Sequence, residues 1–310
     1  MKKFCFVLSF LLGGSLAFIA CGPGDPELPQ INLLEIISGE PELSTFLTAL
    51  ERTSLTTMLD STGTFTVFAP TNTAFANFLN TNGYAKVEDV PVSALKQLLL
   101  YHMVPTVLEE NIFIAGSIPS LANFGAPIIP MQLYLTSKNG WGVNGVPVAM
   151  SEHLANGNLH AVNTVIALPT VITPATYDLA FSTFLTALTR PDLGIDYVAT
   201  LSEAGPFTLF VPTNNAFTAF LFELGYANLD AVPTNALNAI LQYHIVPNAN
   251  LTGSDLKSLS EVTTLGGKKF SITTGTKISD NLGRTANLLA LDFQAVNGVV
   301  HSVDKVLRPN

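Results

Sequence analysis

One seven-residue segment occurs twice in this chain of 310 residues, and the repetition limits what the chain can fold into more than any other feature. The segment STFLTAL occupies residues 44–50 and again residues 182–188. A chance repeat of this length is rare in so short a chain. The sequence therefore indicates an internal duplication, and the rest of each half should show it too.

Longer motifs follow the heptapeptide in the same order in both halves. In the first half they are TFTVFAPTNTAF (64–75), LLLYHMVP (98–105) and NLHAVNTVIALP (158–169). Their counterparts are PFTLFVPTNNAF (206–217), ILQYHIVP (240–247) and VVHSVDKVLRP (299–309). The offset between paired motifs stays between 138 and 142 residues, which predicts two homologous domains with short loop insertions rather than a solenoid of small repeats. We place the first domain at residues 31–169 and the second at residues 170–310.

The first thirty residues are expected to lie outside both domains. A short basic start precedes residues 4–20, which are apolar over a length that suits a secretory signal peptide. The segment Phe-Ile-Ala-Cys at 18–21 resembles the lipobox of bacterial lipoproteins, in which a small residue precedes a cysteine that becomes the acylated N-terminus. We therefore predict a signal peptide at 1–20, lipidation of Cys21 and a flexible, lipid-anchored tether at 21–30. The alternative is an ordinary signal peptide followed by a cysteine without this use.

Cysteine content and charge restrict the chemistry of the exported protein. Cys5 would leave with the signal peptide, so Cys21 would have no partner for an internal disulfide. Without residues 1–20 the chain has 12 basic and 23 acidic side chains, a net charge of −11. Nucleic acids and anionic lipid surfaces repel such a chain. This excludes nucleic-acid binding and assigns membrane attachment to the lipid.

Hydrophobic spacing predicts helices and strands in the same order in each half. Residues 43–50 carry apolar side chains at i, i+3, i+4 and i+7, which predicts an amphipathic helix, and residues 181–188 repeat the pattern. The run TFTVFAP at 64–70 has the composition of a strand. Either Thr71 or Asn72 would then be the N-cap of the next helix.

A further helix is expected from Pro91 to His102, with a counterpart that begins at Pro233. The glycine-punctuated segments GVNGVPVAM (142–150) and KKFSITTGTKIS (268–279) predict hairpins, and a strand is expected at 161–168. Helices early and strands later predict an α+β domain with a largely antiparallel sheet.

The ordered motifs FTVFAPTNTAF, LLLYHMVP and NLHAVNTVIALP closely resemble the fasciclin I domain, and the second set resembles it equally well. The two resemblances together cover nearly everything from residue 31 to residue 310. They imply two tandem α+β domains, each a β-sheet wedge or sandwich with flanking helices. Domains of this kind occur in secreted and surface-anchored adhesion proteins.

Two Tyr-His pairs, Tyr101-His102 and Tyr243-His244, are the best-known dipeptide of that family and have been implicated in receptor binding in its animal members. They are the candidate interaction residues of this chain. A structural role is the interpretation that the residues themselves favour. A histidine that ends a helix beside apolar residues can bond its ring nitrogens to backbone groups and interact favourably with the helix C-terminus.

No sequence motif indicates an enzyme. The chain has no G-x-S-x-G, no G-x-x-x-x-G-K-[ST] and no H-E-x-x-H segment. Four of its five histidines fall in two repeated positions, which gives no clustered set of zinc ligands. We therefore predict no catalytic residue, no cofactor and no metal site.

The leading hypothesis is a cell-surface lipoprotein that acts in adhesion or in matrix or envelope interaction, by non-catalytic binding of a protein or glycan. Cys21 would anchor it to the bacterial cell envelope. Gly22, rather than Asp, follows this cysteine and is consistent with sorting to an outer membrane. The alternative is a periplasm-facing lipoprotein that binds a small ligand or serves as an envelope scaffold. A hydrolase, the third class, has no positive support in the sequence.

Overall fold

The computed structural model describes residues 31–61, 63–108, 116–125, 128–136, 141–148, 152–273 and 277–310. The predicted signal peptide (1–20), Cys21 and the tether (21–30) lie outside these residues. In the described part of the chain, no helix has the length and apolar character needed to cross a membrane.

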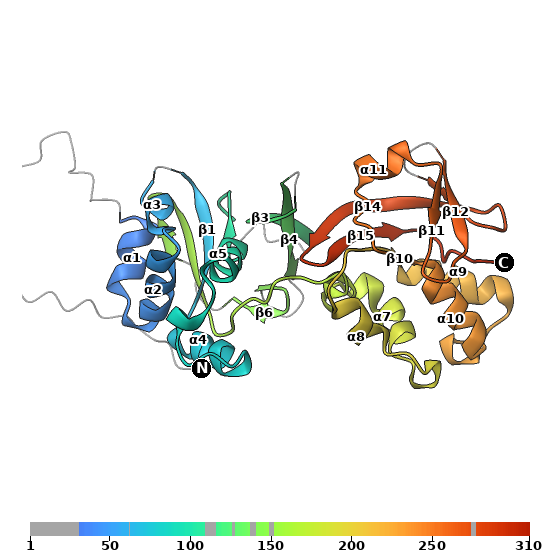
Figure 1. The fold of residues 1–310 in the computed structure, drawn as a ribbon, viewed down its shortest axis with the longest axis horizontal. Helices are drawn as coiled ribbons and strands as arrows, with labels where there is room; N and C mark the ends of the chain where they lie inside the picture. The colour runs from blue at the N-terminus through green and yellow to red at the C-terminus, as the bar shows by residue number, and fades with distance from the viewer. Residues whose placement is uncertain are drawn as a thin grey trace, which may run out of the picture. The chain divides into compact units, whose positions relative to one another are not determined.

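The two halves contain helices and strands in a similar order (Figure 1). The first half contains α1 (Leu33–Gly39), η1 (Pro41–Leu43), α2 (Ser44–Arg52), α3 (Thr56–Leu59), β1 (Phe65–Pro70), α4 (Asn72–Thr81), η2 (Val87–Asp89), α5 (Val92–Tyr101), β2 (Met103–Val104), β3 (Gly116–Phe124), β4 (Ile129–Thr136), β5 (Gly142–Val143), β6 (Val146–Pro147), β7 (Glu152–Leu154) and β8 (Gly157–Val162). The second contains α6 (Thr173–Tyr177), η4 (Leu179–Phe181), α7 (Ser182–Leu188), η5 (Pro191–Leu193), α8 (Tyr197–Ser202), β9 (Phe207–Pro212), α9 (Asn214–Leu224), η6 (Leu229–Ala231), α10 (Thr234–Tyr243), β10 (Ile245–Pro247), α11 (Gly253–Ser258), β11 (Glu261–Thr263), β12 (Lys269–Thr273), β13 (Lys277–Ser279), β14 (Thr285–Ala295) and β15 (Gly298–Val303).

The predicted helices form for the expected reasons. The repeated heptapeptide lies in α2 and α7, whose buried faces place Phe46 against Phe75 and Phe184 against Phe217, both with ring centroids 6.4 Å apart. Of the two candidate N-caps of α4, Thr71 is the one used, since its hydroxyl accepts a hydrogen bond from the backbone N–H of Ala74.

Sheet pairing shows one feature that the strand pattern did not predict. The sheets have the orders β2-β1-β8-β7, β3-β4-β5-β6 and β10-β9-β15-β14-β13-β12-β11. Most neighbours are antiparallel, including the predicted hairpins β5–β6 and β12–β13. The pairs β1–β8 and β9–β15 are parallel. Parallel neighbours require a long crossover connection, and here most of each domain supplies it.

The strand expected at 161–168 is largely wrong, because it overlaps β8 (Gly157–Val162) only at residues 161 and 162. Strand β8 ends at Val162, and the chain continues in irregular conformation. The backbone N–H of Ile166 donates to the Nε2 atom of His102, at 2.9 Å, instead of to a neighbouring strand. Residues 163–168 therefore form a segment beside the helices, and this segment shapes the site described next.

Candidate functional site

The first Tyr-His pair is buried at the end of α5. His102 is fully buried, with Nδ1 2.8 Å from the carbonyl oxygen of Leu98 and Nε2 accepting the N–H of Ile166. The hydroxyl of Tyr101 donates to the carbonyl of Gln132 at 2.8 Å and accepts from the Nδ2 group of Asn144 at 2.7 Å. The pair thus joins α5 to β4 and to the segment after β8.

The second pair repeats this arrangement. His244 is fully buried, with Nδ1 2.8 Å from the carbonyl oxygen of Ile240 and Nε2 accepting the N–H of Leu307 at 3.0 Å. The Tyr243 hydroxyl donates to the carbonyl of Lys269 at 2.6 Å. Both histidines hold the segment that follows the last strand of their half. A partner cannot reach them in this conformation, and a role in partner contact stays a prediction.

Burial also controls the ionisation of these groups. It lowers the pKa of His102 and of His244 to about 4, because the charged imidazolium would lose its hydration. For His244 the nearby carboxylate of Asp280 offsets only part of this effect. Burial raises the pKa of Tyr101 above its ordinary value and raises that of Tyr243 to about 12. All four side chains are therefore neutral near pH 7.

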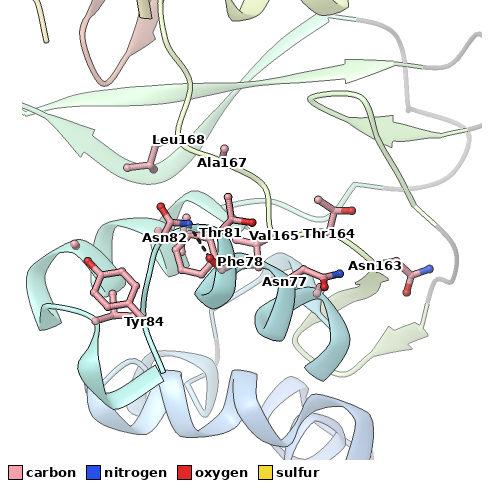
Figure 2. Close-up of a pocket in the computed structure, with 14 residues that line it drawn as sticks. Asn77, Phe78, Thr81, Asn82, Tyr84, Asn163, Thr164, Val165, Ala167 and Leu168 are labelled. Atoms are coloured by element: carbon pink, nitrogen blue, oxygen red, sulfur yellow. Dashed lines mark hydrogen bonds between the residues drawn. The ribbon is translucent and has the colours of Figure 1, made fainter. Parts of the chain in front are cut away.

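A groove of about 520 Å³ opens in the first half, and we call it the α4 groove (Figure 2). One wall is α4 with the turn that follows it, and the other is the segment 163–168. Its floor is apolar and consists of the buried side chains of Ala74, Val90, Leu98 and Val165. Because His102 bonds Ile166, the buried Tyr-His pair positions one wall of this groove.

The rim of the α4 groove is polar and uncharged. It carries the exposed side chains of Asn77, Thr81, Asn82, Asn163 and Thr164. Asn82 uses its Nδ2 group to bond the carbonyl of Phe78, at 2.8 Å. In the part of the chain that the structure describes, the other four side chains form no internal hydrogen bond. Donors and acceptors are therefore available along the opening.

Two aromatic side chains lie in the groove beneath this rim. Phe78 comes from α4 and Tyr84 from the turn after it, and both are half-buried (Figure 2). None of the lining residues is acidic or basic. Among the described residues no group of histidine, cysteine and carboxylate side chains could hold a metal ion. The arrangement can bind a neutral molecule and has no constellation for catalysis.

At the corresponding place in the second half, an ion pair connects the two walls. The two His-backbone bonds align Ile166 with Leu307, so Arg308 stands where the first half has Ala167. Counting from the N-caps Thr71 and Thr213, Glu223 stands where the first half has Thr81. Arg308 donates to the Glu223 carboxylate at 2.7 Å and ties the two walls together.

One aromatic side chain is buried in the half that has this ion pair and half-buried in the half that lacks it. Phe220 in the second half is 3% exposed, whereas its counterpart Phe78 is half-buried in the open groove.

Sequence reasoning missed the α4 groove, although one signal was present. Comparison of the two copies position by position shows an oppositely charged pair, Glu223 and Arg308, where the other copy has Thr81 and Ala167.

The duplicated α+β halves, each with a buried Tyr-His pair, define a protein of two tandem α+β domains. The chain belongs to the fasciclin domain family, whose model matches residues 41–169 and again residues 179–309. The predicted resemblance and the α+β fold of two tandem domains are thereby confirmed. Proteins of this family are generally adhesion or matrix proteins without enzymatic activity.

Individual relatives cover different shares of the chain. It is 32% identical over 180 residues to protein sll1483 of Synechocystis sp., which spans 56% of this chain and 93% of that protein. It is 28% identical over 276 residues to periostin of Homo sapiens, spanning 86% of this chain and 30% of periostin. It is 26% identical over 279 residues to transforming growth factor-beta-induced protein ig-h3 of Sus scrofa, spanning 88% and 37%. The chain thus spans about a third of these two animal relatives.

The same fold is seen among solved structures. One of them is the FAS1 domain pair of the insect cell adhesion molecule fasciclin I, with a TM-score of 0.52 and 18% identity. The likeness covers 86% of this chain and 96% of that one, so it extends over both domains.

Proposed function

We propose that this chain is an exported lipoprotein that acts in adhesion or in matrix or envelope interaction through non-catalytic binding by its two fasciclin domains. The observation that carries the proposal is the tandem match of the family model, since fasciclin domains generally serve adhesion or matrix contact. Cys21 would carry the lipid and hold the protein at the outer membrane, and residues 22–30 would link this anchor to the two domains. The partner is a protein or a glycan.

Two domains on one tether suit this function. If both engage the same surface, the second contact forms at high effective concentration, so overall affinity exceeds that of either domain alone. An acyl anchor of two or more chains is stable, whereas one chain gives only reversible attachment. The proposal therefore requires that Cys21 be acylated and that the domains face outward.

The test is protease treatment of intact cells that carry the native chain or Cys21→Ser, with immunoblots of cells and medium. The native form should be digested on intact cells, and Cys21→Ser should lose its acyl label and appear in the medium or periplasm. Cys5→Ser is the matched control, because Cys5 leaves with the signal peptide and its loss should change neither acylation nor digestion.

Protection of the native form until the envelope is opened would contradict surface display and favour the periplasm-facing alternative. Binding is tested separately, by adhesion of cells to immobilised matrix proteins and envelope glycans. Equal adhesion by cells with and without the native chain would contradict the adhesive function.

A further inference from the structure

We propose that the α4 groove binds a neutral oligosaccharide and that the first domain, not the second, is the glycan-binding domain of this chain. This inference rests on the proposed function, because it names the chemical class of the partner. Four features of the groove carry it: its size, its lack of charge, its aromatic lining and its unpaired polar rim.

Size and charge select the class of ligand. A volume of about 520 Å³ is within the range of small-molecule sites, roughly 300 to 1,000 Å³, and holds a few sugar rings. The lining has no acidic or basic side chain, in a chain whose net charge is −9. An anionic polysaccharide would be repelled by the chain and would find no cation in the groove. A cationic ligand would find no carboxylate there to replace its hydration.

The rim and the aromatic residues select sugar over a purely apolar ligand. Each sugar hydroxyl both donates and accepts hydrogen bonds, and the side chains of Asn77, Thr81 and Asn163 do the same. A sugar ring also has an apolar C–H face, which can pack on the ring of Phe78 or Tyr84. A purely apolar ligand would cover the rim amides and leave them without partners, at a cost in binding free energy.

In the second domain an ion pair closes the place that corresponds to the α4 groove. We therefore assign sugar binding to the first domain alone. In the second domain the guanidinium of Arg308 bonds Glu223 across the walls, Arg284 lies 3.5 Å from the same carboxylate, and Phe220 is covered. A sugar would have to break this ion pair to reach the aromatic ring. In the first domain the small side chains of Thr81 and Ala167 leave the ring of Phe78 accessible.

The test transfers the second domain's ion pair into the first. The variant Thr81→Glu/Ala167→Arg should bridge the α4 groove, and both positions are exposed, so the fold should tolerate the change. The full chain, in a detergent without a sugar head group, is measured by biolayer interferometry. The probes are biotinylated neutral oligosaccharides of glucose, galactose, mannose and N-acetylglucosamine, together with sulfated counterparts.

The native chain should bind at least one neutral oligosaccharide, and the bridged variant should bind it about tenfold more weakly or worse, since the ligand must now break an ion pair. Asn77→Ala/Asn163→Ala should weaken binding about fivefold or more through lost rim hydrogen bonds. This second variant decides the question if the first fails to fold by circular dichroism. The control is Asn80→Ala, an exposed position of α4 outside the groove, which should bind as the native chain does.

Three results would overturn the inference. They are no binding of any neutral oligosaccharide at millimolar concentration, preference for the sulfated probes, and binding that both groove variants leave unchanged. In the first case, uptake of the neutral dye N-phenyl-1-naphthylamine by the native chain, but not by the bridged variant, would identify an apolar ligand instead. Loss of this inference with intact surface display and adhesion would leave the proposed function standing. Sugar binding by a chain that protease cannot digest on intact cells would support this inference and contradict the surface display in the proposed function.

Discussion

The side-chain carbonyl of Asn72, in the first turn of α4, accepts a hydrogen bond of 2.9 Å from the backbone N–H of Thr45, in the first turn of α2. The residue before α2, Leu43, has no side chain that can cap the helix, so the cap comes from 27 residues further along the chain. Asn72 also donates to the carbonyl of Pro41 at 2.8 Å. Asn214 repeats both bonds in the second domain, with Thr183 and Leu179.

This relationship predicts that Asn72→Ala destabilises the first domain. Loss of a helix cap and of a second hydrogen bond should lower the free energy of unfolding by about 1–2 kcal/mol. Asn72→Asp should cost less, because a carboxylate still accepts the Thr45 N–H and is favoured at a helix N-terminus. Urea unfolding measures both, and Asn80→Ala in the same helix is the control. Equal stability of Asn72→Ala and Asn80→Ala would contradict the capping role.

Gly157 should not tolerate a side chain. It begins β8 opposite Phe65, and a Cβ atom there would lie 1.9 Å from the carbonyl oxygen of Phe65, at a φ of +147°. Gly157→Ala should therefore cost about 3 kcal/mol or more, through backbone collision and strain at the parallel pair. Gly39→Ala is the control, since no atom lies within 4 Å of a Cβ at that position. The measurement is thermal unfolding, and similar melting temperatures for the two variants would refute the prediction.

Acid should destabilise both domains through the buried histidines. The folded pKa values of His102 and His244 are about 4, below the ordinary 6.5 of an unfolded chain. Between pH 6.5 and 4 the unfolded chain therefore binds protons that the folded chain does not, so stability is full above pH 6.5 and falls as the pH falls. Over this pH range, protonation linked to each histidine can lower the free energy of unfolding by up to about 3 kcal/mol.

Urea unfolding between pH 7 and pH 4.5 checks this expectation. His102→Gln will lower stability at every pH, so the informative quantity is the slope of unfolding free energy against pH. The slope should be smaller for His102→Gln than for the native chain. Two parallel curves would show that His102 does not take part in the acid response.

The two tyrosines of the Tyr-His pairs should differ in their cost of replacement. Tyr101→Phe removes two hydrogen bonds and leaves the buried Nδ2 group of Asn144 without its partner, which should cost about 2 kcal/mol. Tyr243→Phe removes the hydrogen bond to the carbonyl of Lys269 but leaves no buried side-chain amide without its partner, so it should cost about 1 kcal/mol. Chemical denaturation of each variant measures the two costs. A larger loss for Tyr243→Phe would contradict the hydrogen-bond accounting.

Features that depend on neighbouring residues could be predicted from the sequence. The apolar spacing of 43–50 produced α2, Thr71 capped α4, and Pro91 preceded α5. The Asn144-Gly145 turn closed the β5–β6 hairpin with positive φ at both residues. Such features follow from backbone preferences and side-chain periodicity over a few residues, and the duplication doubled the evidence for each.

The candidate site was only partly predictable for the same reason. The sequence singled out Tyr101 and His102, but their place behind the wall of the α4 groove depends on the bond from His102 to Ile166, 64 residues away. The groove itself depends on whether Thr81 and Ala167, on separate elements, carry charge or small side chains. No local pattern indicates that these two positions face each other.

By itself, the sequence determined the duplication, the order of helices and strands, the fasciclin family and the lack of a recognisable catalytic motif. Only the tertiary structure decided that β1 pairs in parallel with β8, that this strand ends at Val162, that Asn72 caps a distant helix and that one of two homologous grooves stays open. The physical reason is that local conformation follows from adjacent side chains. Strand partners, caps and grooves arise where distant segments meet, and their packing and hydrogen bonds select one arrangement.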